Sequence, residues 1–356
     1  MEIGQNNSNL TLYDRSMWIE YHFFVTLWFA VMMGLSAVGA VANITLTITI
    51  LSSEKLRSGC GVLIAHLLLV SATLCAVHLP LLTVTTYYMA PKQPLGITFC
   101  RVTVLFYFST LYVVNWTAML ISINRFVAIV YPYKYNAHFA SYKVGFSLIA
   151  LSWTVVLCCN FLVFFNHGGR FEATRPWGAC GITVIRNSMI YPMITVICVT
   201  FPTALEGVMY VAIFATVGWR ALLRRRKIRH VVERAIERRN SLVQKRYRSV
   251  KMLSVSYLWY SVCFMPAPIA SSIFPHVYSS SPLLQLFLRV LLLCGYTTIP
   301  FIYLALSNDY RSRFVQLYHS ISHFRSPQPP TFPCTQEIFT ISKHVHAKNQ
   351  PNEMFY

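Results

Sequence analysis

The residues of this 356-residue chain that could carry chemistry stand singly within long apolar stretches. Asn124 and Arg125 lie near the end of one stretch, and Glu206 and Arg289 interrupt two others. An isolated charge in such a setting needs a partner, so it suits pairing with another group. The sequence shows no carboxylate pair, metal-ligand cluster, nucleophile triad or phosphate loop. We therefore expect a protein that is not an enzyme and that uses neither a metal nor another cofactor.

Seven apolar stretches must position these residues, and each reaches the roughly 20 residues that a membrane-spanning helix needs. Helices satisfy their own backbone polar groups inside a bilayer. We expect an all-α membrane protein whose seven-transmembrane helix bundle covers residues 23–306, with an extracellular head at 1–22. The spans are predicted at 23–50, 60–84, 100–130, 143–166, 189–217, 250–274 and 283–306. The first span is too long for a cleaved signal peptide, so we expect it to act as an uncleaved anchor.

The segment after the seventh span carries aromatic and aliphatic residues at helical spacing. Tyr310, Phe314 and Leu317 recur every three or four residues among charged ones. This pattern is typical of a short amphipathic helix lying in the membrane interface, which we expect at residues 307–321. The proline-bearing remainder, residues 322–356, is predicted to be a disordered cytoplasmic tail.

The formal net charge of +19 is distributed unevenly among the span ends. One set of ends holds most of the Lys and Arg: Lys55, Arg57, Arg125, Lys134, Lys143, the run from Arg220 to Lys251, Arg311, Arg313 and Arg325. Positive residues stay cytoplasmic. We therefore expect an extracellular N-terminus, a cytoplasmic C-terminus and contact with anionic membrane lipids, and we expect no nucleic-acid partner. The sequons that begin at Asn6 and Asn9 fall in the predicted outer head, where glycosylation occurs.

A set of individual residues occurs in a fixed order along the predicted spans. They are Asn43, Pro80, Cys100, the run Asn124-Arg125-Phe126, Pro132, Trp153, Cys180, Pro202, Tyr210, the run Cys263-Phe264-Met265-Pro266, and the run Ile299-Pro300-Phe301-Ile302-Tyr303. In order and spacing this set resembles the rhodopsin-like (class A) G-protein-coupled receptors, from Phe23 to about Tyr318.

The resemblance implies an outward ligand pocket and an inward cleft that binds a heterotrimeric G protein when the sixth helix moves. It also implies a disulfide between Cys100 and Cys180, on the oxidising side of the membrane. Three groups of site residues carry over from the family. The switch residues are Asn124, Arg125, Tyr210 and Tyr303; the hinge prolines are Pro202, Pro266 and Pro300; and Phe264 takes the toggle position, where Trp is common.

The chain departs from the family pattern at several positions. Ser71 stands where the second helix usually has Asp, and Ile299 where Asn usually precedes the seventh-helix proline. Without a carboxylate we expect no interior sodium site. Asn124 replaces an acid, and Arg246 stands where many relatives have Glu. Because Arg125 lacks both acidic partners, we expect elevated basal signalling. The alternatives are that Asn124 hydrogen-bonds Arg125 or that the receptor is silent.

Arg289 is the residue that bears most on the ligand. It lies about two turns, roughly 10 Å, into the seventh helix from its outer end. It could pair an anionic ligand group, such as a carboxylate, a phosphate or a peptide C-terminus. Alternatively it reaches the outer headgroups or pairs with Glu172. We expect Tyr107, Phe106 and Trp177 to line the same pocket; Tyr107 in place of Asp argues against a monoamine ligand.

These features predict a receptor that signals an extracellular ligand to heterotrimeric G proteins at the plasma membrane. The tail carries Ser and Thr residues that would permit kinase and arrestin regulation. A seven-helix transporter or channel is the alternative from another class, but Glu206 is the only acid within the spans. A scavenging receptor that has lost coupling is a further alternative, because the acidic partners of Arg125 are missing.

Overall fold

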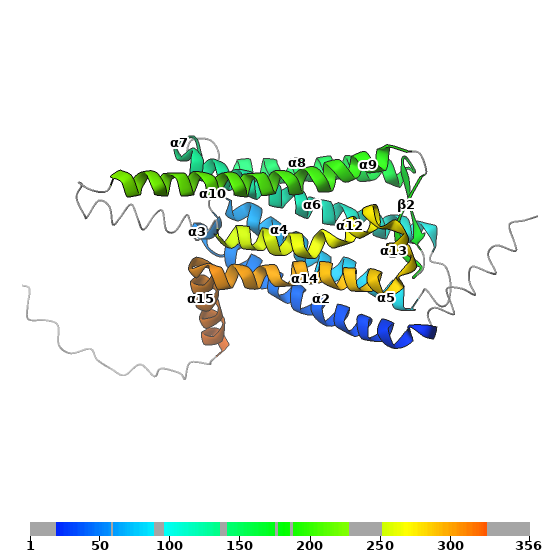
Figure 1. Ribbon diagram of the computed structural model, residues 1–356. Coiled ribbons are helices and arrows are strands. Elements are labelled where there is room, and N and C mark those ends of the chain that lie inside the picture. Colours follow the sequence, from blue (N-terminus) through cyan, green and yellow to red (C-terminus); the bar gives the residue numbers. More distant parts are fainter. Residues whose placement is uncertain are drawn as a thin grey trace, which may run out of the picture. The chain divides into compact units, whose positions relative to one another are not determined.

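The computed structural model describes residues 19–57, 60–88, 96–135, 141–174, 177–185, 188–227 and 251–325. Figure 1 shows long helices side by side and a short hairpin at one end of them. Within the described ranges, seven helical segments are long and apolar enough to cross a membrane. The seven-helix expectation is therefore confirmed, and the chain is a multi-pass membrane protein.

The elements follow the predicted order closely. The first span is α2 (His22–Leu51). The second consists of α4 (Gly61–Thr73), η1 (Leu74–His78) and α5 (Leu79–Tyr88). The third is α6 (Ile97–Val130) and the fourth is α8 (Tyr142–Phe164). The fifth span consists of α9 (Ile190–Thr195), η3 (Val196–Thr200) and α10 (Phe201–Lys227). The sixth consists of helical residues 251–264 and α12 (Pro266–Ile273), and the seventh is α14 (Pro282–Leu306). The connecting and terminal elements are α3 (Glu54–Arg57), α7 (Pro132–Lys134), β1 (Gly169–Thr174), β2 (Ala179–Val184), α13 (Pro275–Ser280) and α15 (Asn308–Arg325).

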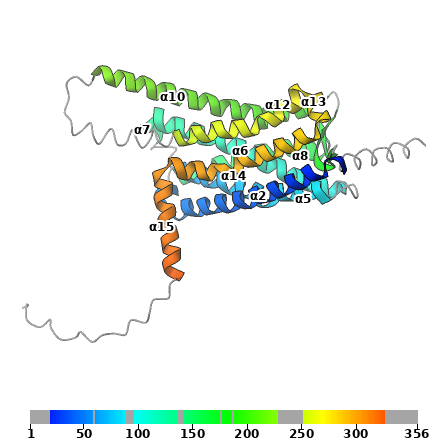
Figure 2. The same cartoon turned by 60° about the horizontal axis from the view of Figure 1, so that its bottom comes forward.

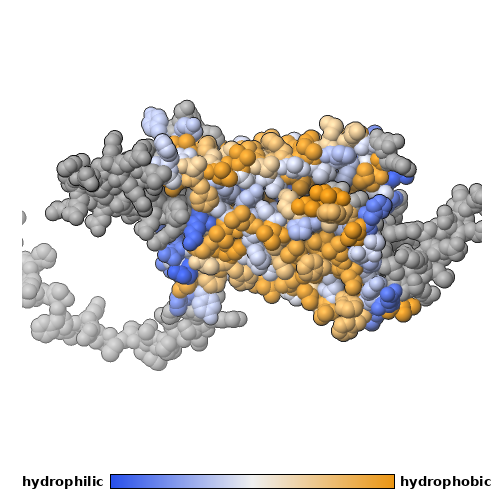
Figure 3. All heavy atoms as spheres, in the orientation of Figure 1, coloured by the Kyte–Doolittle hydropathy of each residue, from blue (hydrophilic) through white to orange (hydrophobic). Residues whose placement is uncertain are grey.

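The distribution of polarity is that of a bundle immersed in lipid. Large apolar side chains such as Phe23, Val41 and Val262 are exposed on the helices, whereas Asn43 and Ser71 are completely buried. Figure 3 shows hydrophobic residues across the middle of one face and hydrophilic residues gathered at its two ends. Because lipid tails are as apolar as leucine, packing and hydrogen bonds hold such helices together rather than water exclusion.

Two prolines reshape the helices that contain them. A proline ring clashes with the carbonyl four residues earlier and offers no N–H to it. Before Pro80 and before Pro202 the helix widens into a π-turn, in which Leu79 N–H donates to Leu74 O and Phe201 N–H donates to Val196 O. At the sixth span the chain turns at Met265 and α12 begins at Pro266. Pro300, by contrast, lies inside an uninterrupted α14.

The outer connection between α8 and α9 contains a two-stranded antiparallel sheet that the all-α expectation omitted. The chain enters it through Asn166 (φ 64°) and Gly168 (φ 82°), two residue types that tolerate positive φ. In the register of β1 and β2, Ala173 lies opposite Cys180. Sequence patterning missed the strands because each leaves only a weak pattern. β2 is a mostly apolar run without alternation, and β1 is short and mixes polar with apolar residues.

Helix ends differ from prediction by a few residues in most places. The largest difference is at α10, which remains helical to Lys227, ten residues beyond the predicted end at 217. Figures 1 and 2 both show α10 running past the inner end of α6, on the side where α7 lies. The helix expected after the seventh span is confirmed as α15, which continues to Arg325 rather than ending at residue 321. No Gly or Pro interrupts it before Pro327.

Candidate functional site

A hydrogen-bonded chain of buried side chains crosses the centre of the bundle. Asn115 on α6 donates to Cys198 O at 3.3 Å, and Tyr260 OH donates to Asn115 Oδ1 at 2.9 Å. The hydroxyls of Tyr260 and Tyr296 lie 3.2 Å apart, and Asn43 Nδ2 donates to Tyr296 O at 3.2 Å. The chain therefore joins five of the seven spans. The buried Asn115 amide is thus hydrogen-bonded by groups on two other helices.

Cys198 O is the carbonyl that Pro202 leaves without its usual donor. Pro202 lacks the N–H that would reach four residues back, and Asn115 supplies a donor from another helix instead. Phe264 belongs to the same region, because its ring stacks on Tyr260 with centroids 5.3 Å apart. The predicted toggle and one predicted hinge thus meet at Asn115 and Tyr260, two residues that were not predicted as site residues.

The end of the bundle that is predicted to be its inner mouth gathers aromatic hydroxyls around Arg125. The groups that act electrostatically on its guanidinium are Cys60, Tyr310, Tyr135 and Tyr210. The Nε atom of Arg125 is buried without a hydrogen-bond partner. Tyr303, predicted to act with Tyr210, is buried and stacks on Tyr310 with centroids 6.2 Å apart. The four switch residues predicted from the sequence therefore lie within one neighbourhood.

Asn124 does not bond to Arg125 in this conformation. Its Oδ1 instead accepts a hydrogen bond from Tyr135 OH at 3.3 Å. Burial raises the pKa of the Tyr135 and Tyr310 phenols, so both are neutral hydrogen-bonding groups at physiological pH. Arg246, the other position weighed as a neighbour of Arg125, lies outside the described residues.

Next to this end of the bundle is a small cavity lined by the one acid within the seven spans. Its volume is about 30 Å³. Glu206 is 6% exposed and lines it together with tyrosines from three helices. The lining residues are Leu67, Val114, Ala118, Ile121, Glu206, Tyr210, Leu253, Ser256, Tyr257, Tyr260, Ile299 and Tyr303.

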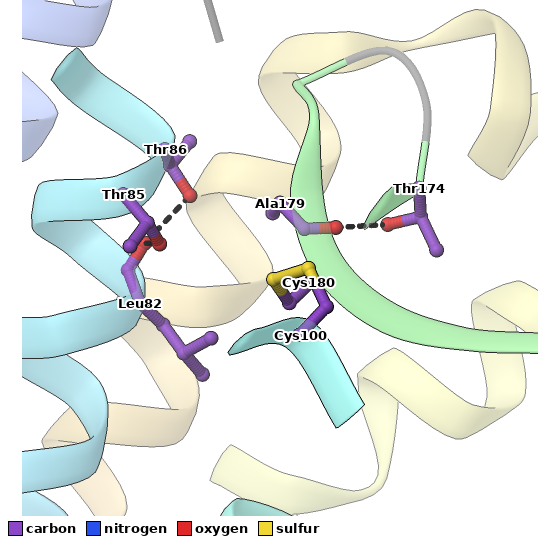
Figure 4. Close-up of a disulfide and its surroundings, with 7 residues drawn as sticks. All are labelled: Leu82, Thr85, Thr86, Cys100, Thr174, Ala179 and Cys180. Atoms are coloured by element: carbon purple, nitrogen blue, oxygen red, sulfur yellow. Dashed lines mark hydrogen bonds between the residues drawn. A yellow bond between two sulfur atoms is a disulfide. The ribbon is translucent and has the colours of Figure 1, made fainter. Parts of the chain in front are cut away.

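At the opposite end of the bundle, its predicted outer mouth, the expected disulfide joins Cys100, at the start of α6, to Cys180 on β2. Figure 4 shows this bond between the α6 turn and the strand, with Thr174 Oγ1 donating to Ala179 O at 2.9 Å beside it. Trp177, in the turn of the hairpin, is 2% exposed and its Nε1 donates to Pro282 O at 3.2 Å. The hairpin is therefore fixed to both the third and the seventh spans.

Arg289 lies in the outer half of the bundle beside two tyrosines. Its Nη1 donates to Thr86 Oγ1 at 3.3 Å, and Thr86 in turn donates to Leu82 O. Tyr278 and Tyr107 are the groups that act on its charge. The ion pairs found among the described residues are Lys55–Asp309 and Arg57–Glu54, so neither involves Arg289 or Glu172.

The predicted pocket residues are only partly brought together. Tyr107 is partly buried and faces Arg289. Trp177 is an anchor of the hairpin to α14, and Phe106 is 56% exposed. The predicted glycosylation sites Asn6 and Asn9 lie outside the described residues, as does the tail beyond Arg325.

Comparison with known proteins assigns this arrangement to a family. The model of the family described as "7 transmembrane receptor (rhodopsin family)" matches residues 42–303, which is most of the chain. This chain is a rhodopsin-family receptor. Members of that family are signalling receptors rather than enzymes.

Individual relatives match the receptor over shorter segments. An allatostatin-A receptor of Bombyx mori is 29% identical over 133 residues, or 37% of this chain and 36% of the relative. G-protein coupled receptor 84 of Mus musculus is 26% identical over 152 residues, or 43% of this chain and 37% of the relative. The matched segment thus spans little more than a third of the length of these curated relatives.

The receptor has no acid at the positions that would anchor an interior sodium ion. Ser71 Oγ donates to Leu67 O at 2.8 Å, which occupies its hydroxyl within its own helix, and Ile299 is 4% exposed. Across the described part of the receptor, no group of three or more His, Cys, Asp or Glu side chains could hold a metal ion. Glu206 is elsewhere, on α10.

Sequence reasoning missed Tyr260, Tyr296, Cys60 and Tyr135 as functional neighbours. Tyr260 is six residues before Pro266 and Tyr296 is four before Pro300, so distance from a helix proline was a usable signal. Cys60 precedes the second span immediately, at the end of the bundle where Arg125 lies. No sequence pattern around Cys60 would have indicated that it lies beside Arg125.

Proposed function

We propose that this receptor carries an extracellular signal across the plasma membrane and activates a heterotrimeric G protein, with its N-terminus outside and its C-terminus in the cytoplasm. The observation that supports this most is the inner mouth. An arginine there has no acidic partner among the described residues and is surrounded by Tyr210, Tyr310 and Tyr135. Phenol groups that can exchange hydrogen bonds with a guanidinium suit a site that rearranges when a partner binds.

Elevated basal activity forms part of the proposal. A guanidinium held by a carboxylate is locked by a charge-assisted hydrogen bond, which contributes about twice as much as a neutral one. The described neighbours of Arg125 are all neutral, so less free energy opposes its release toward a G protein. In this proposal the basic span ends contact anionic lipid on the same side, and Ser and Thr residues of the tail serve kinases and arrestin.

The experiment is agonist-free nucleotide exchange on G proteins in membranes that contain the receptor or its Arg125→Ala variant. We expect exchange above that of membranes without receptor, and its loss in Arg125→Ala. Arg57→Ala is the matched control, because it removes an exposed guanidinium at the same end. Exchange equal to that of receptor-free membranes with every G-protein subtype would favour a scavenging receptor. Ion or solute flux through reconstituted vesicles would favour a transporter or channel.

The proposed ligand carries an anionic group that pairs with Arg289. Its guanidinium offers five N–H donors, and one described hydrogen bond, to Thr86, uses one of them. A carboxylate, a phosphate or a peptide C-terminus would take the others in bidentate fashion. A ligand screen should include allatostatin-A, which the name of the silkworm relative specifies. Arg289→Lys should weaken an anionic agonist and Arg289→Ala should weaken it more, whereas equal potency in all three receptors would exclude the pairing.

A further inference from the structure

Glu206 is the only acidic residue within the seven spans, and it is placed inside the bundle rather than toward lipid. It lies one helical turn after Pro202 and one turn before Tyr210. No hydrogen bond or ion pair reaches its carboxyl from the part of the chain that the structure describes. A buried carboxyl without partners is expensive to keep, so its presence calls for an explanation.

The groups that face Glu206 are phenols rather than charges. Tyr257 and Tyr260 come from the sixth span, Tyr303 from α14 and Tyr210 from α10 itself. The contributions of α4 and α6 to the cavity are apolar, and Arg125 and Cys60 act on Tyr210 rather than on Glu206. Ser256 is the remaining polar group in the lining.

The sixth span approaches Glu206 unusually closely at the next residue. A Cβ on Gly207 would lie 2.6 Å from the Tyr257 hydroxyl oxygen, and that hydroxyl donates to Thr203 O at 3.4 Å. Tyr257 therefore packs on the glycine beside Glu206 and forms part of the cavity wall. Any outward movement of the sixth span would lift this ring and admit water to the carboxyl.

The two protonation states of the carboxyl suit two different surroundings. The described lining of the cavity offers an ionised carboxylate no cation, so the neutral acid is the stable form here. A cavity of about 30 Å³ exceeds the roughly 10–15 Å³ that one water needs. Once water enters and phenol O–H groups turn toward it, the carboxylate becomes the stable form, because hydrogen bonds to the charged state favour it.

We propose that Glu206 is an interior proton-binding site whose occupancy depends on the position of the sixth span. With that span packed as here the carboxyl keeps its proton. When the span moves away, the O–H bond breaks, the carboxylate retains the electron pair and water carries the proton to the cytoplasmic side. The coupling to signalling rests on the proposed function, which requires this movement. By linkage, a higher pH then favours the active receptor.

A hard cation is a poorer occupant than a proton. Metal ions of this kind take several oxygen ligands, typically six or more for Ca²⁺. The cavity offers one carboxyl and a few phenols. The site is therefore not a relocated version of the sodium site that Ser71 and Ile299 exclude.

The first test is infrared spectroscopy of the purified full-length receptor in lipid nanodiscs, recorded as differences between acidic and alkaline pH. We expect a protonated-carboxyl carbonyl band that titrates in the wild type, is absent in Glu206→Gln and is retained in Glu206→Asp. Replacing sodium with N-methylglucamine should leave the band unchanged. Spectra that are identical in wild type and Glu206→Gln would overturn the proposal, and so would a band whose titration requires sodium.

The second test is agonist-free nucleotide exchange measured against pH. Exchange by the wild type should rise with pH, by at most about tenfold per pH unit for one proton. Glu206→Gln should be less active and lose this slope, while Glu54→Gln, which removes an exposed acid on α3, should retain it. An unchanged slope in Glu206→Gln would overturn the linkage. A titrating band in a receptor with no exchange at any pH would support the proton site and contradict the proposed G-protein coupling instead.

Discussion

The side-chain amide of Asn115 donates to the carbonyl of Cys198, four residues before Pro202 on another helix. This bond, at 3.3 Å, compensates for the donor that proline removes and couples the third span to the fifth. Tyr260 then bonds to the carbonyl oxygen of the same amide, so one Asn serves two helices. The hinge at Pro202 is therefore held by a polar network rather than by apolar packing alone.

We expect Tyr260→Phe to destabilise the receptor by about 1–3 kcal/mol, because Asn115 Oδ1 would be left buried without its donor. Thermal unfolding in detergent measures this. Tyr257→Phe is the matched control, since it loses only a long hydrogen bond of 3.4 Å from a half-buried ring. Asn115→Leu combined with Tyr260→Phe should cost less than the sum of the single changes. Strict additivity would contradict a shared network.

Breaking the outer disulfide should loosen the hairpin and the start of α6 together. The bond closes a loop of 80 residues, for which chain entropy alone gives about 4.5 kcal/mol. Cys100→Ser, Cys180→Ser and the double variant should lower thermal stability and surface expression equally. A double variant that is clearly worse than either single one would indicate that the two cysteines act separately.

Asn124→Asp should lower basal nucleotide exchange. A carboxylate next to Arg125 would provide the charge-assisted partner that the neutral amide, occupied by Tyr135, does not. A hydrogen bond to a charged group contributes about 1.5–3 kcal/mol, so a decrease of tenfold or more is expected. Asn124→Ala, which adds no charge, should not produce it. Basal exchange that is equal in Asn124→Asp and wild type would show that Arg125 is restrained in another way.

Sodium should not change ligand affinity or basal exchange. Ser71 and Ile299 supply no carboxylate, and the Ser71 hydroxyl is committed to Leu67 O. The measurement compares sodium chloride with N-methylglucamine chloride at equal ionic strength. The Ser71→Asp, Ile299→Asn double variant should gain sodium sensitivity, because a hard cation prefers such oxygen ligands. A sodium effect in the wild type would locate a cation site that the described residues do not reveal.

The membrane spans were predictable because their signal is local. Each is one continuous apolar run, so length and hydropathy suffice, and every predicted span lies within a few residues of an observed helix except at the end of α10. The disulfide and the switch residues came from the resemblance to the rhodopsin-like receptors rather than from any local pattern. The hairpin at 169–184 was missed because two six-residue strands leave a weak pattern.

The polar interior could not be predicted in the same way. Tyr260 and Asn115 are 145 residues apart in sequence, and nothing in either local pattern indicates the other. Whether Glu206 faces lipid, a neighbouring helix or a cavity depends on how α10 is rotated in the bundle. That rotation is set by packing against several helices at once.

The measurement that tests the central claim most directly is the accessibility of epitope tags at the two ends of the chain in intact cells. Seven spans with an outer head and an inner tail predict that an N-terminal tag binds antibody without permeabilisation and that a C-terminal tag requires it. Both tags accessible from the same side would contradict a bundle with an odd number of crossings, and the receptor mechanism built on it.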